Sequence, residues 1–462
     1  MSLPQVPKKW DGEADVIIVG GGNAGLPAAI TAHDKGAKVM VLETSSGMAS
    51  SLAMIAGGTP FAGTDLQKTE GIEDSPDQLY DEAVKVSGGS PELWRAIADR
   101  QLEVYEWLKS IGAKPAQVLL GPGHRVMRSV RFEGHGPALC KLLRETAKKK
   151  GIDVRHKHHA EKLIVNPENG RVIGVSAKHD NKILNFRAKK AVILTTGGFV
   201  SNKELIKEFG PNYTGCIPTA PPTHMGDGLR MALAVGAATA GIGLAVCPSL
   251  SVDIHTSRPA LMSAYGAILV KVDGTRWTNE MPTAPGSYTV GYKDLLMQEP
   301  SGEHFTIYDE KSRQGAPPER YRHNKEYSAN TIEELEKILG IPAGALKATI
   351  DEYNSDIDKY GYDRKFGRRQ RGLDDAEEPP TKIDTPPYYA FKCKVCLTSM
   401  KGGLKINTKT QIIDQFGEII PGLYAAGEIA GGLMGLPAHY YTGAMTLSAF
   451  VQGRIAGDNA AD

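Results

Sequence analysis

Residues 15–43 read DVIIVGGGNAGLPAAITAHDKGAKVMVLE, and this stretch decides the fold. Its opening apolar run suits a buried strand. Gly20, Gly22 and Gly25 follow with the spacing G-x-G-x-x-G, which lets a chain turn tightly beside a pyrophosphate and a helix pack closely. After the helix, a second strand ends at Glu43, whose carboxylate can accept both hydroxyl protons of an adenosine ribose. A glycine-rich turn without a ligand is the alternative interpretation. Strand, helix, strand and acid in register favour a dinucleotide-binding βαβ unit.

The rest of the chain distinguishes between dinucleotides. An acid after the second strand argues against a 2′-phosphate and leaves FAD or NAD. Three later segments are typical of a site that binds FAD in an extended conformation at both of its ends. They are a strand ending in TTGGF at 195–199, a segment GLYAAGE at 422–428 and a helix start at 443–447. A second G-x-G-x-x-G after a strand is missing from the sequence. We therefore predict bound FAD and no dedicated NAD domain.

These features predict an α/β fold with a Rossmann-like FAD-binding domain of the glutathione-reductase type, in which a central parallel sheet carries a small antiparallel sheet. Alternating segments at 160–166, 170–178 and 182–187 predict the small sheet, and a separate core strand is expected at 191–194. The residues predicted to contact FAD are Gly20, Gly22, Asn23, Ala24, Gly25, Glu43, Thr44, Ser50, Ser51, Gly57, Gly58, Thr196, Gly197, Gly198, Asp227, Gly427, Glu428, Ala444, Thr446 and Leu447.

A change of composition marks a second domain. Residues 249–387 hold aromatic side chains, several prolines, an amphipathic stretch and a charged run. We interpret this part as an inserted α+β cap domain, which makes the FAD-binding domain discontinuous over 1–248 and 388–462.

Composition excludes several classes of function. The formal net charge of +1 offers no basis for binding nucleic acid or an anionic membrane surface. No apolar run reaches 18 residues, and the N-terminal residues have no apolar core of a signal peptide. We expect no membrane span and a cytoplasmic location.

Cysteines and histidines do not form a recognisable metal site. Cys393 and Cys396 are spaced as C-x-x-C, but no second pair exists and they follow a strand-like run, so we interpret them as strand residues. His156, His158 and His159 are interpreted as polar residues of a strand near a surface turn. We predict no metal.

As a set, the motifs resemble the flavoprotein family of fumarate reductases and succinate dehydrogenases, together with the related 3-ketosteroid dehydrogenases. The resemblance covers nearly the whole chain and implies an FAD-dependent oxidoreductase without fixing its substrate. Besides the opening stretch and TTGGF, its carriers are GDGLRMALAVGA at 226–237, ILVKVDGTRWTNE at 268–280, NTIEELEKILGIP at 330–342, MKGGLKIN at 400–407 and IPGLYAAGEIAGG at 420–432.

The departures from the family pattern bear on the substrate. Dicarboxylate-reducing members carry a histidine at the position of Ser399 and arginines at the positions of Tyr440 and Ala284. Without these groups two substrate carboxylates would be buried unpaired, so fumarate or succinate chemistry is not expected. Ser51 stands in the place of the histidine that binds flavin covalently in the respiratory complexes, which implies non-covalent FAD.

A tyrosine-rich segment takes the place of the missing cations. HYYTG at 439–443 is similar to the Tyr-x-Ser-Gly loop of 3-ketosteroid Δ4-(5α)-dehydrogenases. The resemblance implies that Tyr440 and the Gly443 N–H hold a ketone, while Thr442, with Tyr441 or the cap residue Tyr288, handles a proton. The alternative is that these tyrosines are packed aromatic residues with satisfied hydroxyl groups.

The predicted function is that of an FAD-dependent oxidoreductase acting on a CH–CH bond next to a ketone. A hydride is exchanged with flavin N5, and the developing enolate is stabilised by phenolic hydrogen-bond donors. The predicted partners are a hydrophobic, steroid-like ketone or enone and an unidentified electron donor or acceptor. Two alternatives stay open: a fumarate-reductase-like flavoprotein that reduces another enone or enoate, and an electron-transfer subunit of a complex.

Overall fold

The structure is a computed structural model, and it describes residues 6–47, 51–54, 58–121, 123–252, 262–263, 265–280, 292–318, 321, 324–371, 377–378, 380–436 and 441–462. Contacts between Cα atoms divide the chain into two compact units. The first unit comprises residues 1–210, 220–245 and 399–462, and the second comprises 211–219 and 246–398. Whether the second unit acts as a cap over the cofactor stays a prediction.

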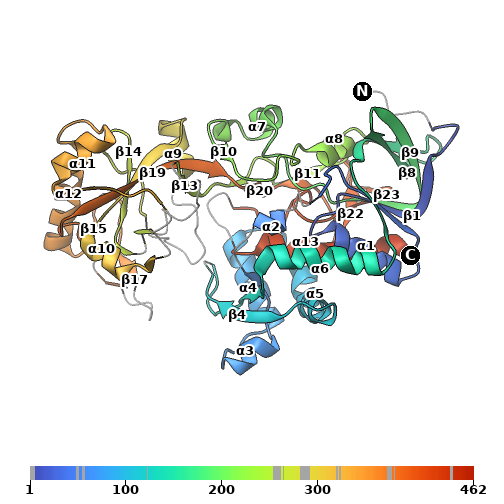
Figure 1. Ribbon diagram of the computed structural model, residues 1–462, viewed down its shortest axis with the longest axis horizontal. Coiled ribbons are helices and arrows are strands. Elements are labelled where there is room, and N and C mark those ends of the chain that lie inside the picture. Colours follow the sequence, from blue (N-terminus) through green and yellow to red (C-terminus); the bar gives the residue numbers. More distant parts are fainter. Residues whose placement is uncertain are drawn as a thin grey trace. The chain divides into compact units, whose positions relative to one another are not determined.

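The first unit is built on an eight-stranded sheet (Figure 1). Its main path runs β22 (Gln411–Ile413), β23 (Ile419–Ala425), β9 (Lys182–Leu194), β1 (Gly12–Val19), β2 (Val39–Leu42) and β6 (Asp153–Arg155). All neighbours on this path are parallel except β22 and β23. The register pairs Val19 with Leu42 and Leu194, and Leu194 with Ala425, so four carboxyl ends meet at one edge. The predicted fold class is confirmed.

One detail of the predicted sheet was wrong. The segments expected at 182–187 and 191–194 form a single strand, β9, of 13 residues. Its first half pairs with β8 (Val172–His179), which also pairs with β7 (His159–Val165), and its second half joins the parallel sheet beside β1. β9 takes part in an antiparallel branch and in the parallel core of one sheet, so its first half is polar and its second half is apolar. This change of pattern resembles the end of one strand and the start of another.

Helices cover the parallel sheet of the first unit. α1 (Gly25–Asp34) packs against the C-terminal helix α13 (Ala444–Ala461), and both carry many small residues, which allow close approach (Figure 1). α4 (Pro76–Ser87) begins at Ser75 and α5 (Pro91–Ser110) begins at Ser90, and each serine hydroxyl accepts a backbone N–H of the first turn. In both helices a proline follows the capping serine at the first helical position, where its missing N–H costs no hydrogen bond.

The remaining elements of the first unit are shorter or peripheral. They are α2 (Ser51–Met54), β3 (Thr59–Pro60), α3 (Asp65–Thr69), β4 (Pro115–Leu119), β5 (Ser129–Phe132), α6 (His135–Lys149), α7 (Lys203–Phe209), α8 (Asp227–Leu233), β11 (Thr239–Ala240) and β21 (Gly403–Leu404). β12 (Ala245–Val246) and β20 (Ser399–Met400) lie where the two units of the chain meet in sequence.

The second unit has its own sheet and its own core. The long strand β19 (Tyr388–Leu397) pairs with β10 (Ile217–Pro218), β13 (Ser249–Ser251), β15 (Glu303–Asp309) and β16 (Tyr327–Ala329), and β15 pairs with β14 (Ile268–Lys271). Its other elements are a 3-10 turn (Pro211–Tyr213), α9 (Tyr292–Gln298), α10 (Glu310–Gly315), α11 (Ile332–Leu339), α12 (Ala345–Tyr360), β17 (Gln370–Arg371) and β18 (Glu377–Glu378).

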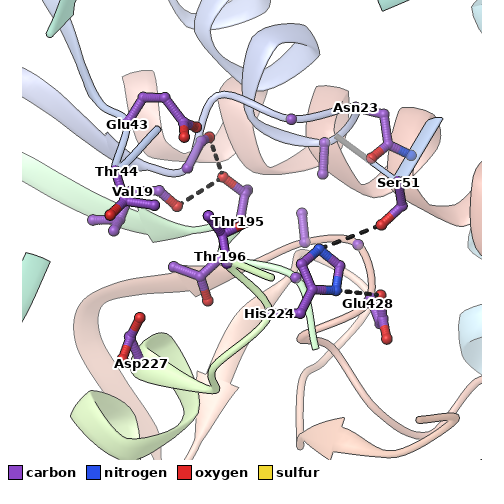
Figure 2. Close-up of a pocket in the computed structure, with 18 of the residues that line it drawn as sticks. Val19, Asn23, Glu43, Thr44, Ser51, Thr195, Thr196, His224, Asp227 and Glu428 are labelled. Carbon is purple, nitrogen blue, oxygen red and sulfur yellow. Dashed lines mark hydrogen bonds and ion pairs between the residues drawn. The ribbon is translucent and has the colours of Figure 1, made fainter. Parts of the chain in front are cut away.

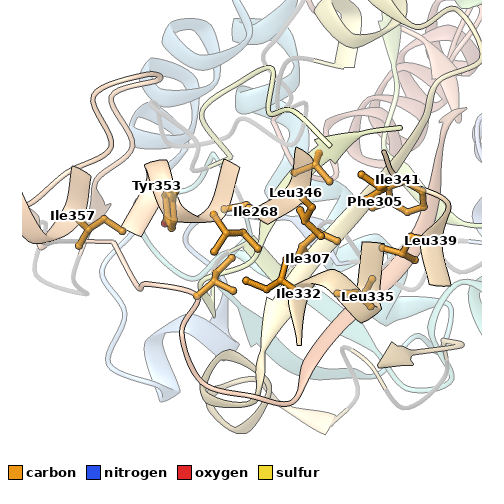
Figure 3. Packing of buried hydrophobic residues seen from close by; sticks show 14 residues of the cluster. Ile268, Phe305, Ile307, Ile332, Leu335, Leu339, Ile341, Leu346, Tyr353 and Ile357 are labelled. Carbon is orange, nitrogen blue, oxygen red and sulfur yellow. The ribbon is translucent and has the colours of Figure 1, made fainter. Parts of the chain in front are cut away.

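An apolar cluster holds this second unit together (Figure 3). Ile268 and Ile307 on the sheet pack with Leu335 of α11 and Leu346 of α12, and each of these side chains is fully buried. Apolar residues recur along α11 and α12 at helical spacing, so each helix has one apolar face that packs on the sheet. The amphipathic stretch of the sequence therefore forms two helices, which are separated at Gly340.

Cys393 and Cys396 are buried residues of β19, as the sequence predicts for strand cysteines. Three positions apart on a strand, their side chains point to opposite faces, so they cannot bind one metal ion together. Within the described ranges, no helix combines the length and the apolar character needed to cross a membrane.

Candidate functional site

A pocket opens at the edge where the parallel strands end (Figure 2). Val19, Leu42, Thr195 and Ala426 lie at or next to the carboxyl ends of β1, β2, β9 and β23, and all four line the pocket. Ligands of open parallel sheets bind at this edge because the loops that leave the strands meet there. The pocket holds about 910 Å³ of empty space, part of it open to solvent.

The glycines of the first loop are required by close contacts. A Cβ atom on Gly25 would lie 1.9 Å from the carbonyl oxygen of Gly20 and 2.7 Å from Oγ1 of Thr195. Gly20 itself has φ of +105°, and a Cβ there would meet the carbonyl oxygen of Thr195 at 2.5 Å. The loop and the first turn of α1 therefore lie against the end of β9, with the glycine backbone facing the pocket.

Backbone donors hold the carboxylate of Glu43 at one end of the pocket. Its Oε2 accepts the N–H of Gly21 at 2.8 Å and its Oε1 accepts the N–H of Ser45 at 2.7 Å. Each carboxylate oxygen can accept more than one hydrogen bond, so both keep acceptor capacity for a ligand. This is the geometry that a diol such as the adenosine ribose requires.

Two histidines and an aspartate lie near that end. Thr44 Oγ1 is 3.0 Å from Nδ1 of His159, whose Nε2 is 3.8 Å from Oδ2 of Asp227. Burial raises the pKa of Asp227 above its ordinary value. His158 is also in the lining, and its ring stacks on His179 with centroids 4.1 Å apart.

His224, Ser51 and Glu428 lie together at another wall of the pocket (Figure 2). Nε2 of His224 lies 3.3 Å from the hydroxyl of Ser51, and Nδ1 lies 3.5 Å from Oε2 of Glu428. Burial lowers the pKa of His224 to about 4 and raises the pKa of Glu428 to about 8, so both groups are uncharged near neutral pH. The contact is therefore not an ion pair at that pH.

The polar atoms of the lining fit a dinucleotide. Thr196 Oγ1 and His224 Nδ1 are buried and have no hydrogen-bond partner among the described residues. Buried polar atoms are normally paired in a working site, and a ligand that carries hydroxyl groups and phosphate oxygens offers such partners. Gly198 has no room for a side chain, because a Cβ there would lie 2.2 Å from Oε1 of Glu428.

The structure brings most of the predicted cofactor residues into this one pocket. The lining contains Gly20, Gly22, Asn23, Ala24, Glu43, Thr44, Ser51, Thr196, Gly197, Asp227, Gly427, Glu428 and Thr446. Of the described residues in the prediction, five lie outside the lining: Gly25, Gly58, Gly198, Ala444 and Leu447. Ser50 and Gly57 are outside the described residues.

Sequence reasoning missed several residues of the lining. His158 and His159 were interpreted as polar residues near a surface turn, but both line the pocket, because β7 begins at His159 beside α8. His224 and Met445 were not singled out. The sequence offers a signal for His224, because this residue stands two positions before the motif at 226–237 that carries the family resemblance and contains Asp227.

The tyrosine-rich segment is described from Tyr441 onward, and Tyr440 and Tyr288 are outside the described residues. Tyr441 is fully buried, and its hydroxyl accepts a hydrogen bond from Arg128 Nη1 at 2.6 Å and donates one to Glu82 Oε1 at 3.1 Å. This matches the alternative interpretation, a packed tyrosine with a satisfied hydroxyl. The carbonyl of Thr442 accepts from His124 Nε2 at 3.1 Å.

Gly443 begins α13 with φ of +77°, and a Cβ on it would lie 2.6 Å from the carbonyl oxygen of Gly58. Met445 and Thr446, two and three residues later, are in the pocket lining. The chain therefore passes directly from the tyrosine-rich segment into the wall of the pocket.

A buried lysine was also missed. Lys401 is 2% exposed, and its Nζ donates at 3.0 Å to the carbonyl of Leu436, which stands three positions before His439 in the sequence. The motif MKGG contains this lysine, which the comparison of Ser399, Tyr440 and Ala284 with the dicarboxylate-reducing members did not consider.

Comparisons with known proteins agree with this geometry. Residues 15–439 match the family model described as an FAD binding domain. The chain is 31% identical over 458 residues to the probable fumarate reductase Ifc3 of Shewanella frigidimarina (strain NCIMB 400), covering 96% of this chain and 74% of the relative.

Two solved structures are similar over almost the whole chain. The open conformation of a flavocytochrome c3 fumarate reductase has a TM-score of 0.82 and 30% identity, with 98% of this chain and 78% of that chain covered. The 3-ketosteroid-Δ4-(5α)-dehydrogenase of Rhodococcus jostii RHA1, in complex with 4-androstene-3,17-dione, has a TM-score of 0.78 and 27% identity, with 98% of each chain covered. Together with the pocket at the strand ends, these matches show that the chain belongs to the FAD-binding fumarate reductase and succinate dehydrogenase superfamily and is an FAD-dependent oxidoreductase.

Proposed function

We propose that FAD is held non-covalently in the pocket at the strand ends. Glu43 would bind the ribose, the N–H groups at the start of α1 would face the phosphates, and Glu428 would accept from hydroxyl groups of the cofactor. The proposal is supported by the unpaired polar atoms of Thr196 and His224 in the lining. FAD, when bound, supplies the group that takes or gives the hydride.

For the substrate, we propose a ketone or enone of steroid-like character, oxidised or reduced at the carbon–carbon bond beside the carbonyl. The observation that carries this proposal is the tyrosine-rich segment where dicarboxylate-reducing relatives have a cation. Tyr440 and the Gly443 N–H would hold the carbonyl oxygen, because a developing enolate needs hydrogen-bond donors. Since the hydroxyl of Tyr441 is bound to Arg128 and Glu82, proton handling is assigned to Thr442 or Tyr288.

A second candidate is the reduction of an enoate, and one observation favours it. Lys401 is buried and its Nζ donates to the carbonyl of Leu436, and in its charged form it could pair with one substrate carboxylate. The similarity to a probable fumarate reductase supports this candidate as much as the similarity to the steroid dehydrogenase supports the first. An electron-transfer subunit would instead need an exposed flavin edge and a protein partner.

The two candidates are separated by anaerobic stopped-flow absorbance. Photoreduced protein is mixed with a 3-keto-4-ene steroid, with fumarate and with a monocarboxylic enoate, and flavin reoxidation is followed. The first candidate predicts reoxidation by the steroid within seconds and a loss of about 100-fold in Tyr440→Phe. The second predicts reoxidation by an enoate and a comparable loss in Lys401→Met. A protein that reacts with neither class contradicts both candidates. The electron partner and a cytoplasmic location stay predictions from the sequence.

A further inference from the structure

The residues that follow Tyr440 are fixed by side chains from a distant part of the chain. Arg128 and Glu82 bind the hydroxyl of Tyr441, and His124 donates to the carbonyl of Thr442. The imidazole of His124 also lies against the ring of Tyr441, with centroids 4.6 Å apart. Two successive residues are therefore held by hydrogen bonds, Tyr441 through its side chain and Thr442 through its main chain. Both stand directly before α13, whose first turn lines the pocket.

Arg128 is the centre of a buried cluster. Its Nη2 lies 3.0 Å from Asp74 Oδ1, and its Nη1 lies 3.2 Å from Glu82 Oε1. The side chains of Arg128, Asp74 and Glu82 are 1%, 0% and 6% exposed. Asp74 is held in turn by Gln67, whose Nε2 donates to Oδ2 at 2.8 Å. The guanidinium group thus connects α4 and the segment before it to the hydroxyl of Tyr441.

The charges of the cluster do not balance if every group is ionised. Among the described residues in contact with it, one guanidinium faces two carboxylates, and the adjacent His124 is neutral because burial lowers its pKa to about 3. Burial also raises the pKa values of Asp74 and Glu82. The carboxylate pair therefore retains one proton at a higher pH than an isolated carboxyl group would.

We propose that Arg128, Glu82 and His124 are positioning residues that hold residues 441–443 in place where the chain enters α13, and that the protonation state of Asp74 and Glu82 makes this placement depend on pH. The identity of the substrate rests on the proposed function above, whereas the placement of the segment does not. The Tyr441 hydroxyl acts here through its neighbours and does not touch the reacting atoms.

The proposal is tested on the FAD-loaded protein with Tyr441→Phe, Glu82→Gln and the double variant. Tyr105→Phe is the matched control, because Tyr105 is also fully buried and donates to a carboxylate, Asp65, at 2.5 Å. With whichever acceptor reoxidises the flavin, we expect kcat/KM to fall by about 100-fold in each single variant and no further in the double variant. The control should stay within about twofold of the wild-type protein.

Two further readouts separate positioning from general destabilisation. In Glu82→Gln the acidic limb of the pH profile of kcat/KM should shift relative to the wild-type protein, because one carboxyl group of the pair no longer titrates. Amide hydrogen exchange of the peptide 441–450 should become faster in Tyr441→Phe and stay unchanged in Tyr105→Phe.

The exchange measurement needs no substrate, so it decides the positioning claim even when no ketone or enoate reacts. Wild-type kcat/KM and exchange rates in the folded, FAD-loaded Tyr441→Phe protein would overturn the positioning role, and a wild-type pH profile in Glu82→Gln would overturn the pH dependence. A steroid that fails to react would contradict the proposed substrate and leave this comparison intact.

Discussion

The imidazole of His224 lies 3.5 Å from the carboxyl group of Glu428, and both groups are neutral near pH 7. Burial is the common cause, because a low dielectric disfavours the charged imidazolium and the charged carboxylate alike. The pocket therefore presents hydrogen-bonding groups rather than charges at this wall.

Glu428 should make the stability of FAD-free protein depend on pH. Its pKa is about 8 in the folded chain against an ordinary value of 4.5. The contribution of Glu428 to the free energy of unfolding is therefore fully present below pH 4.5 and is lost as the pH rises through 8. Glu428→Gln removes the titration. We expect the free energy of unfolding of the variant, relative to that of the wild-type protein, to increase by about 3 kcal/mol from pH 6 to pH 9.

The measurement is urea unfolding of the two FAD-free proteins at several pH values. Lys347→Met, at an exposed pair with Asp351, is a control that should run parallel to the wild-type curve. Parallel curves for Glu428→Gln would show that the carboxyl group titrates normally.

His224 should contribute to FAD affinity through its ring nitrogens. Replacing it by phenylalanine keeps an aromatic ring and removes the unpaired Nδ1 and the contact to Ser51. We expect the Kd for FAD in His224→Phe to rise about tenfold, which corresponds to about 1.4 kcal/mol. Quenching of flavin fluorescence on titration with apoprotein measures it.

The control for this measurement is His33→Phe, at a partly exposed site on α1 outside the pocket lining. An unchanged Kd in His224→Phe would mean that FAD leaves Nδ1 without a partner.

Gly25→Ala should impair both folding and FAD binding. The new Cβ would lie 1.9 Å from the carbonyl oxygen of Gly20, which is backbone and cannot move aside cheaply. Overpacking of this kind costs about 3 kcal/mol, and the first turn of α1 would have to move away from the strand ends. Thermal unfolding and FAD content of the purified protein are the readouts.

Gly47→Ala provides the comparison, since nothing among the described residues lies within 4 Å of the added methyl group. Its thermal unfolding and its FAD content should equal those of the wild-type protein. Equal stability of both variants would contradict the close packing of α1 against the first loop.

Arg276 should be essential to the stability of the second unit. The sequence GTRWTNE places Arg276 four positions before Glu280, and the structure joins them with two contacts of 2.7 Å and adds Asp363 at 2.9 Å. These side chains are at most 2% exposed. Arg276→Met would leave two buried carboxylates short of a partner, and we expect a loss of about 3 to 5 kcal/mol.

Urea unfolding followed by circular dichroism measures this loss, with Lys347→Met as the exposed counterpart that should change stability by less than about 0.5 kcal/mol. A loss in Arg276→Met as small as that of the control would mean that water reaches the cluster.

The core of the fold could be predicted from the sequence because its signals are local. The glycine spacing after β1, the small residues of α1 and the acid after β2 all lie within 29 residues, and each has a geometric reason that holds without the rest of the chain. The Ser-Pro pairs that begin α4 and α5 are local in the same sense. By contrast, β9 was divided in two because one strand passes from a small sheet into the core.

The sequence by itself determined that this chain forms a βαβ unit for a dinucleotide and that Glu43 and Glu428 follow the strands that carry the site. Only the tertiary structure decided the environment of each polar group. Arg128 and Tyr441 are 313 positions apart, and their hydrogen bond depends on how α13, α4 and the 124–128 segment pack. His224 and Lys401 are ordinary polar residues in the sequence, and distant segments bury both, which makes His224 a neutral residue of the pocket wall.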